Sequence, residues 1–414
     1  MISFKGKAAP KRPAAEVRPG PEGPQTVKST GPAIYLDNLQ GRGKVLAERH
    51  AQKPDDIPTR VALATWHQEQ AVLDGDLDHA VQGIALLDGA LKLRPGDAKL
   101  TRQRAGRLSH LHRFAEARAE LEALLARTPD DADTRRALGS VLRNLGEWDA
   151  AEPYLATPSP RPKGFQDFGD EAIRAFQAGR IDEADERLRM AAGAYRDVHP
   201  VAIAWIDLQR GLLRLRTGRY PEAKVFFQSA YERLPQNYVV AEHLAETEGL
   251  LGNYPEALRI YDEVVASTGL PEFMAARAGV LEQLGRKADA EQALAEADAR
   301  WKALLEKYPT ALAAHAISFW LEDKPDAALA LRWAEANLKV RHDPDSWVLA
   351  ARARAASGDK AGAHAAIEAA RKFPVRIDEF FAGIADAHHR LGETEAALAA
   401  LAEARAINPK TPDL

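Results

Sequence analysis

The chain of 414 residues contains no cysteine, and this excludes several kinds of chemistry. Without a thiol there is no disulfide, no cysteine nucleophile and no cysteine-ligated zinc or iron–sulfur centre. No apolar run approaches the ~20 residues that a membrane-spanning helix needs, so we expect no membrane span. A net charge of −4 provides no strongly basic surface, and we therefore expect no binding of nucleic acid.

Motifs of the common enzyme classes are missing as well. The sequence has no GxxxxGK[ST] loop, no GxGxxG after a strand pattern, no GxSxG and no HExxH. We therefore expect no enzyme, with no catalytic residue, no cofactor and no metal ligand. The N-terminus has no apolar signal-peptide core, which favours a cytoplasmic protein. An exported or periplasmic protein is the alternative if a signal segment has been removed.

What the sequence does contain is a repeat with a period of 34 residues, clearest between Ala204 and Gly269. In each copy a small residue is followed by a turn glycine, an aromatic residue, an alanine and a second aromatic residue. The first copy supplies Gly211, Gly218, Tyr220, Ala223 and Phe227, and the second supplies Ala245, Gly252, Tyr254, Ala257 and Tyr261. This pattern resembles the tetratricopeptide repeat, a helix–turn–helix unit of that length.

The same pattern extends along the chain from residue 59. Ten turns are marked at Gly75, His112, Gly146, Gly179, Gly218, Gly252, Gly285, Asp323, Gly358 and Gly392, and an alanine stands five residues after every marker. A small residue at that place lets two helices pack closely. The resemblance therefore implies an all-α fold, a right-handed α-solenoid of about ten helix–turn–helix repeats. The turns without glycine are the least regular boundaries.

Composition divides the chain into five segments. Residues 1–35, rich in proline, glycine and basic side chains, are expected to form a disordered tail. Residues 36–58 are expected to hold a lead-in helix and a linker. A first sub-array of three repeats is expected over 59–157, a proline-rich break over 158–164, and a second sub-array of about seven repeats over 165–410.

Two groups of inner-face side chains are candidates for partner binding. If the repeat register holds, one inner surface carries four basic residues: Lys99, Arg102, Arg136 and Arg143. Arginine suits paired recognition of carboxylates, so this surface is suited to an acidic segment of a partner. The alternative is an ordinary solvated face.

The second group is an apolar stripe followed by acidic residues: Trp205, Leu208, Leu212 and Leu215, then Glu242 and Glu246. The stripe residues recur at spacings of 3, 4 and 3, which places them on one helix face. Exposed in the groove, such a stripe is a binding surface. The alternative is that it packs in the core.

Two further patterns resemble metal sites without completing one. The histidines that lie close together are His110 with His112, and His388 with His389. Neither pair has the i, i+4 spacing of ligands on a helix, and no third ligand is evident. Residues 73–80 (LDGDLDHA) resemble the start of a calcium loop but lack its glycine and glutamate, so N-capping by aspartate is the preferred interpretation.

The sequence thus predicts a non-catalytic scaffold or adaptor that presents a concave groove to a peptide or protein partner. One alternative is a structural accessory subunit of an enzyme or membrane-associated complex. A metal- or small-ligand-binding protein is the less favoured alternative. The identity of the partner and the oligomeric state are not predicted.

Overall fold

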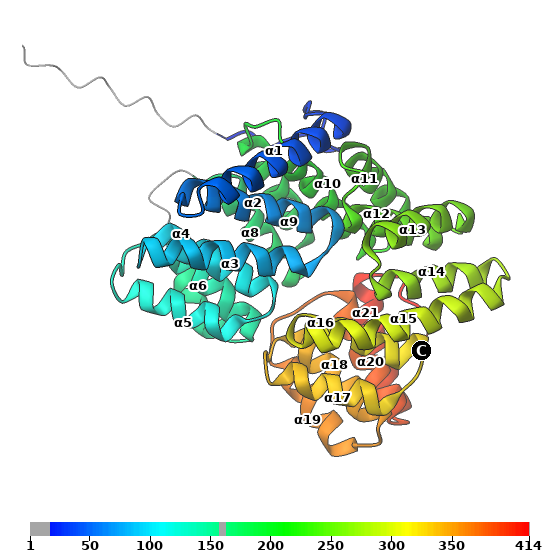
Figure 1. Cartoon of the computed structure of the whole chain (residues 1–414). Coiled ribbons are helices and arrows are strands. Elements are labelled where there is room, and N and C mark those ends of the chain that lie inside the picture. Colours follow the sequence, from blue (N-terminus) through cyan, green and yellow to red (C-terminus); the bar gives the residue numbers. More distant parts are fainter. Residues whose placement is uncertain (1–16, 157–162, 414) are drawn as a thin grey trace, which may run out of the picture.

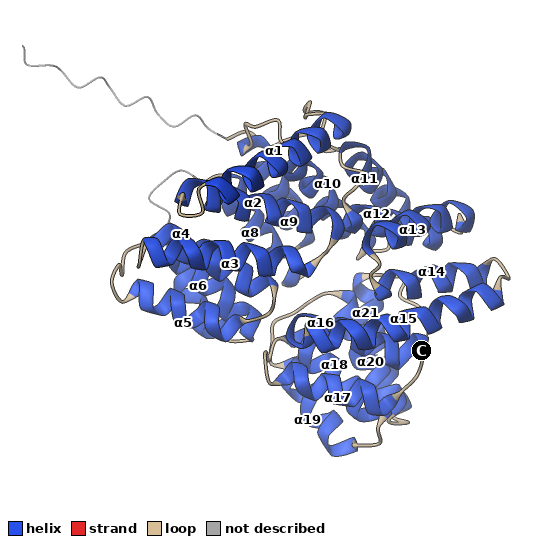
Figure 2. Cartoon of the chain, in the orientation of Figure 1, coloured by secondary structure: helices blue, strands red, loops and turns tan. Residues whose placement is uncertain are grey.

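The structure is a computed structural model that describes residues 17–156 and 163–413, and its regular elements are helical throughout (Figure 2). The described residues form 21 α-helices and no strand. The predicted all-α, tetratricopeptide-like solenoid is therefore confirmed. None of the described helices is long and apolar enough to cross a bilayer. The expectations for residues 1–16, and for most of the proline-rich break, lie outside the described residues.

Helix α1 (Pro32–Gln52) precedes ten helical pairs, one for each predicted repeat. The first five pairs are α2 (Ile57–Asp74) with α3 (Leu77–Leu93), α4 (Ala98–His110) with α5 (Phe114–Leu125), α6 (Ala132–Leu145) with α7 (Trp148–Leu155), α8 (Phe165–Gln177) with α9 (Ile181–Ala194), and α10 (Pro200–Leu215) with α11 (Tyr220–Arg233).

The other five pairs continue the array (Figure 1). They are α12 (Tyr238–Leu250) with α13 (Tyr254–Thr268), α14 (Pro271–Gln283) with α15 (Lys287–Lys307), α16 (Pro309–Ser318) with α17 (Ala327–Leu338), α18 (Pro344–Ala356) with α19 (Lys360–Arg371), and α20 (Asp378–Arg390) with α21 (Thr394–Ile407). Aspartates cap several of these helices; the Asp76 side chain, for example, accepts a hydrogen bond from the Asp78 N–H at 2.9 Å.

The turns between paired helices follow the markers, with one exception. All eight marker glycines have positive φ, and His112 adopts the same conformation with φ 53°. At Asp323 the register fails, because α16 runs into a π-helical turn, η1 (Phe319–Asp323), before α17 begins. The alanine expected to be buried there, Ala328, is exposed, and Ala330 takes its place at 0% exposure.

Residues 17–30 form an extended strap along α9–α11, and this corrects the predicted disordered tail over residues 17–35. Arg210, whose side chain is fully buried, donates hydrogen bonds to three successive backbone carbonyls at residues 21–23. The Asp207 carboxylate, also buried, accepts the backbone N–H of Gln25 at 3.1 Å. The strap is therefore held through its main chain by buried charges. The lead-in helix that follows also starts earlier than predicted.

Successive turns of the superhelix contact each other, and we call the line of contact between residues 111–177 and residues 310–376 the seam. The backbone N–H of His342 donates to the Leu145 carbonyl at 3.0 Å, and that of Arg376 donates to the Gln177 carbonyl at 2.8 Å. The Thr310 hydroxyl, 199 residues after its acceptor, donates to the carbonyl of Leu111 at 3.1 Å. One superhelical turn therefore takes about 200 residues, and the yellow and orange helices return to the side of the blue and cyan ones (Figure 1).

Candidate functional site in the superhelical groove

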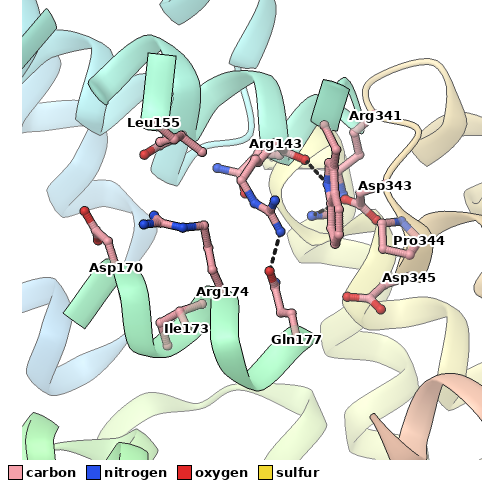
Figure 3. A pocket seen from close by; sticks show the side chains of 13 residues that line it. Arg143, Leu155, Asp170, Ile173, Arg174, Gln177, Arg341, Asp343, Pro344 and Asp345 are labelled. Carbon is pink, nitrogen blue, oxygen red and sulfur yellow. Dashed lines mark hydrogen bonds and ion pairs between the residues drawn. The ribbon is translucent and has the colours of Figure 1, made fainter. Parts of the chain in front are cut away.

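Two cavities bear on the candidate site, and only the smaller one lies at the seam between early and late units. The smaller one, about 260 Å³, lies between α6, α8 and the segment that leads into α18 (Figure 3). We call it the arginine cavity, because Arg143, Arg174 and Arg341 line it. Its third arginine lies about 200 positions after the first in sequence, so the cavity exists only because the superhelix completes a turn.

Arg143 is held in the arginine cavity by the turn that follows its helix. Its guanidinium lies 3.7 Å from the centre of the Trp148 ring and donates to the side-chain oxygen of Gln177 at 2.5 Å. The Trp148 indole N–H donates in turn to the Arg143 carbonyl at 3.1 Å. Burial and the positive charge of Arg174 lower the pKa of Arg143. The side chain is thus fixed in position and only partly solvated.

Arg143 has no direct salt-bridge partner among the described residues, although the negative charge of Glu152 acts on it. Among the described residues no carboxylate lies within salt-bridge distance of Arg143 or Arg174, although Arg174 points toward Asp170 in Figure 3. Burial raises the pKa of Asp170, and the positive charges of Arg174 and Arg136 oppose that shift. Arg341 differs, because Asp343 pairs with it at 3.1 Å.

Asp345 adds a titratable group to the rim of the arginine cavity. Partial removal of water from its carboxyl group by the surrounding protein, together with repulsion from Asp343, raises the pKa of Asp345 to about 6. Asp343 is itself committed, since it caps α18 by accepting the Ser346 N–H at 2.8 Å. The cavity therefore holds two guanidinium groups that form no direct salt bridge with a carboxylate of the described residues, beside the side chains of Asp170, Asp343 and Asp345. An external anion would complete this arrangement.

The other three basic residues of the predicted inner surface either form salt bridges between units or lie exposed to solvent. The Arg102 guanidinium donates to the Asp131 carboxylate at 2.5 Å, and the next unit repeats the arrangement with Arg136 and Asp167 at 3.1 Å. Both arginines therefore tie one unit to the next, whereas Lys99 is exposed at the start of α4. Only Arg143 of the four lines the arginine cavity. Its partner Arg174 was missed, although it lies on the first helix of the following unit.

A larger cavity of about 430 Å³ lies further along the groove, and we call it the apolar cavity. Trp205 and Leu208 line it, together with Tyr238 and histidines from α3 and α4. The remainder of the predicted stripe is structural, because Leu212 is half-buried against the core and Leu215 is 2% exposed within it. The stripe is thus not a continuous exposed patch; its first half faces a cavity and its second half packs inside.

The two predicted acidic residues, Glu242 and Glu246, lie on α12 with His243 between them. The His243 Nδ1 atom is 3.0 Å from a carboxylate oxygen of each. Burial raises the pKa of Glu242 to about 7, and the charge of Glu246 adds to this effect. The positive charge of Arg216 acts on both carboxylates. This acidic cluster is therefore already compensated by neighbouring basic groups.

Comparison with known proteins identifies the repeat. The tetratricopeptide repeat family model matches residues 108–160 and 245–303. No curated relative matches the chain. Among solved structures, a human IFIT1 dimer with PPP-AAAA is 16% identical, with a TM-score of 0.48 over 81% of this chain and 78% of that chain. Yeast Tom70 is 14% identical, with a TM-score of 0.35 over 91% and 92%. The pilF protein of Pseudomonas aeruginosa is 18% identical, with a TM-score of 0.38 over 52% and 93%. At these TM-scores the likenesses carry no inference about binding.

Proposed function

Because the chain is a tetratricopeptide-repeat protein, we propose that it is a non-catalytic scaffold whose superhelical groove binds an acidic segment of a partner protein. Arrays of this repeat serve as protein-interaction scaffolds in general. The observation that carries the specific proposal is the pair Arg143 and Arg174, which share a cavity without a carboxylate partner among the described residues.

A carboxylate that enters the arginine cavity would meet both guanidinium groups in a partly desolvated place. Arginine binds carboxylates through paired hydrogen bonds, and such bonds are about twice as strong as neutral ones. An incoming negative charge would also relieve the repulsion that lowers the pKa of Arg143. We therefore assign the acidic anchor of the partner to this cavity and not to Arg102 or Arg136.

The apolar cavity would take a second, hydrophobic anchor of the same partner. Trp205, Leu208 and Tyr238 offer aromatic and aliphatic walls, and its volume of about 430 Å³ accommodates one large side chain. Extended or helical segments commonly bind such grooves through a few spaced anchors. An acidic residue and a large apolar residue on one segment form the recognition pattern that we propose.

Affinity capture from the native cell extract tests this proposal. The native protein should retain a partner that the double variant Arg143→Gln with Arg174→Gln does not retain. High salt should elute that partner from the native protein. A loss of at least about tenfold in retained partner corresponds to the removal of charged hydrogen bonds worth 1.5–3 kcal/mol each.

The matched control changes two arginines that are exposed and paired within their own helix turns. Arg180 contacts Glu183 at 2.7 Å, and Arg219 contacts Glu222 at 2.7 Å, so Arg180→Gln with Arg219→Gln removes the same charge from the outside. Control and native chains should retain the partner equally. Retention of the same partner by the Arg143/Arg174 variant would contradict the proposal. Loss in both variants would show a dependence on net charge alone.

The runner-up is a structural accessory subunit of a larger complex. It predicts one stable partner that co-purifies with the chain through salt washes. In that case the contact would survive the double variant, because it would not depend on the arginine cavity.

A further inference from the structure

A second group of convergent polar side chains lies at the C-terminal end of the array. His388 lies in the last turn of α20, and its Nδ1 atom is 2.7 Å from one oxygen of Glu393. His364 lies on α19, and its Nε2 atom is 2.8 Å from the other oxygen. One carboxylate is therefore shared by two imidazoles, and the three candidate ligand atoms all lie within 4.8 Å of one another. We call this group the histidine triad.

The elements that carry the histidine triad are held firmly together. The Glu393 N–H donates to the His388 carbonyl at 3.0 Å, which closes the turn between α20 and α21. Beneath the turn, the buried side chains of Ala355, Ala363 and Leu391 form a small apolar cluster. The three polar side chains thus project from a packed base, and this pre-organises them.

We propose that His364, His388 and Glu393 form a binding site for a divalent transition-metal ion, with Zn²⁺ the best match. Two imidazole nitrogens and one carboxylate oxygen are a ligand set that zinc accepts, with water completing the coordination. Metal–ligand bonds of 2.0–2.2 Å place neighbouring ligand atoms ~3.3 Å apart in a tetrahedral site. The present nitrogen–oxygen distances of 2.7 and 2.8 Å, within a set that spans at most 4.8 Å, bracket that spacing, so side-chain adjustment alone would form the site.

The chemistry of the three groups fits an ion that takes the place of two protons. In the structure each imidazole nitrogen faces a carboxylate oxygen of Glu393. A proton on that nitrogen makes the contact a hydrogen bond. A neutral imidazole presents a lone pair at the same atom when its proton moves to the other ring nitrogen.

Access and charge distinguish the histidine triad from the other possible cluster. The side chains of His364 and Glu393 are 46% and 33% exposed, which leaves an entry route and room for bound water. No Lys or Arg of the described chain forms a salt bridge with Glu393. The acidic cluster on α12, in contrast, faces the positive charge of Arg216, which opposes a cation. The inference is independent of the arginine cavity and goes beyond the proposed scaffold function.

Calorimetric titration of the metal-free, untagged full-length protein with Zn²⁺ tests the inference. One ion per chain should bind, and His364→Ala or His388→Ala should weaken the affinity by at least about tenfold. Glu393→Gln keeps the shape of the side chain but removes its charge, and it should weaken binding as well. With Co²⁺ as the probe, the visible spectrum of the native protein should show nitrogen and oxygen ligation that both histidine variants lose.

His389→Ala is the matched control, because His389 is the exposed neighbour of His388 on the same helix and lies outside the triad. This variant should bind Zn²⁺ as the native protein does, and all variants should show equal helicity by circular dichroism. Absence of stoichiometric binding by the native protein would overturn the inference. So would binding that survives both histidine substitutions, or that is lost only on Glu242→Gln with Glu246→Gln.

Discussion

Single charged residues in this chain are stabilised by several partners at once, and Asp298 shows the principle. Its carboxylate accepts hydrogen bonds from the Trp320 indole at 3.0 Å, from Lys302 at 2.8 Å and from Lys324 at 2.9 Å. Burial alone would raise the pKa of Asp298, but these three donors outweigh it and lower the pKa to about 2. The side chain thereby anchors the π-helical turn that carries Trp320.

We predict that Asp298→Asn lowers the free energy of unfolding by about 2 kcal/mol at pH 7. Because the folded-state pKa lies below the unfolded value of 3.8, the stabilisation is present above pH 4 and is lost as the pH falls toward 2. Urea unfolding at pH 7 and pH 3 measures this, and the difference between variant and native protein should shrink by about half.

Asp289→Asn on the same helix is the control for this prediction. Asp289 is half exposed and pairs with Arg286 at 2.6 Å, so its removal should change the stability by less than about 1 kcal/mol. An Asp298→Asn effect that is the same at both pH values would show that the loss comes from packing and not from the charge.

Among the elements, the turns of the array fall into two classes that the repeat pattern does not separate. A Cβ atom added at Gly146 would lie 2.3 Å from the carbonyl oxygen of His342, in the next superhelical turn. Gly179 and Gly218 are similarly covered, whereas Gly252 and Gly358 have nothing within 4 Å. Both classes have positive φ, but only the first also needs glycine for the seam.

We therefore predict that Gly146→Ala destabilises the protein more than Gly252→Ala does. The left-handed backbone costs ~1–2 kcal/mol in both variants, and the clash across the seam adds ~1–3 kcal/mol at Gly146 alone. Equilibrium unfolding followed by circular dichroism makes the comparison. Equal decreases in the free energy of unfolding of the two variants would show that the seam accommodates the added methyl group, and this would contradict the prediction.

For the whole molecule, the strap of residues 17–30 supports α9–α11 in the middle of the array. A truncation that lacks residues 1–30 would leave the buried Arg210 and Asp207 without their backbone partners. We predict that amide hydrogen exchange in α9, α10 and α11 rises at least about tenfold in that truncation, since Arg210 would keep Asp185 and Asp207 would keep Ser229, but both buried groups would lose their other hydrogen bonds.

Exchange in the C-terminal helices should change much less than in α9–α11, because repeat arrays are stabilised mainly between neighbours. Removal of residues 1–16 alone, which retains the strap, is the control and should leave the exchange of α9–α11 unchanged. An equal rise in that shorter truncation would contradict the role of the strap.

The limits of prediction from sequence follow from how far apart the contacting residues lie. The repeat pattern places Gly218 and Ala223 correctly, because each depends on helix and turn geometry within one unit. It also picks out Arg143, which lines the arginine cavity. It does not reveal Arg341 beside Arg143, or His364 beside Glu393, because those contacts depend on the pitch of the superhelix and on side-chain packing between helices.

The strap illustrates the other limit. Its composition is typical of disorder, since proline, glycine and charge provide little apolar surface to bury. The segment is nevertheless ordered by its backbone carbonyls, which every sequence has, and by Arg210 and Asp207, which lie 180 or more residues away. Composition indicates how much apolar surface a segment can bury. It does not indicate whether side chains elsewhere in the sequence will form hydrogen bonds with the backbone of that segment.

The seam changes the mechanical character of the molecule. An open superhelix stretches and unwinds easily, because its neighbouring turns are free to separate. Hydrogen bonds between neighbouring turns restrict this motion and keep the width of the groove nearly constant. In this chain the bonds at Leu111, Leu145 and Gln177 tie one turn to the next over three consecutive units. Tension on its ends must break these bonds before it can draw the helices apart. The proposed partner is therefore expected to enter along the groove, because separating the turns would first break these hydrogen bonds.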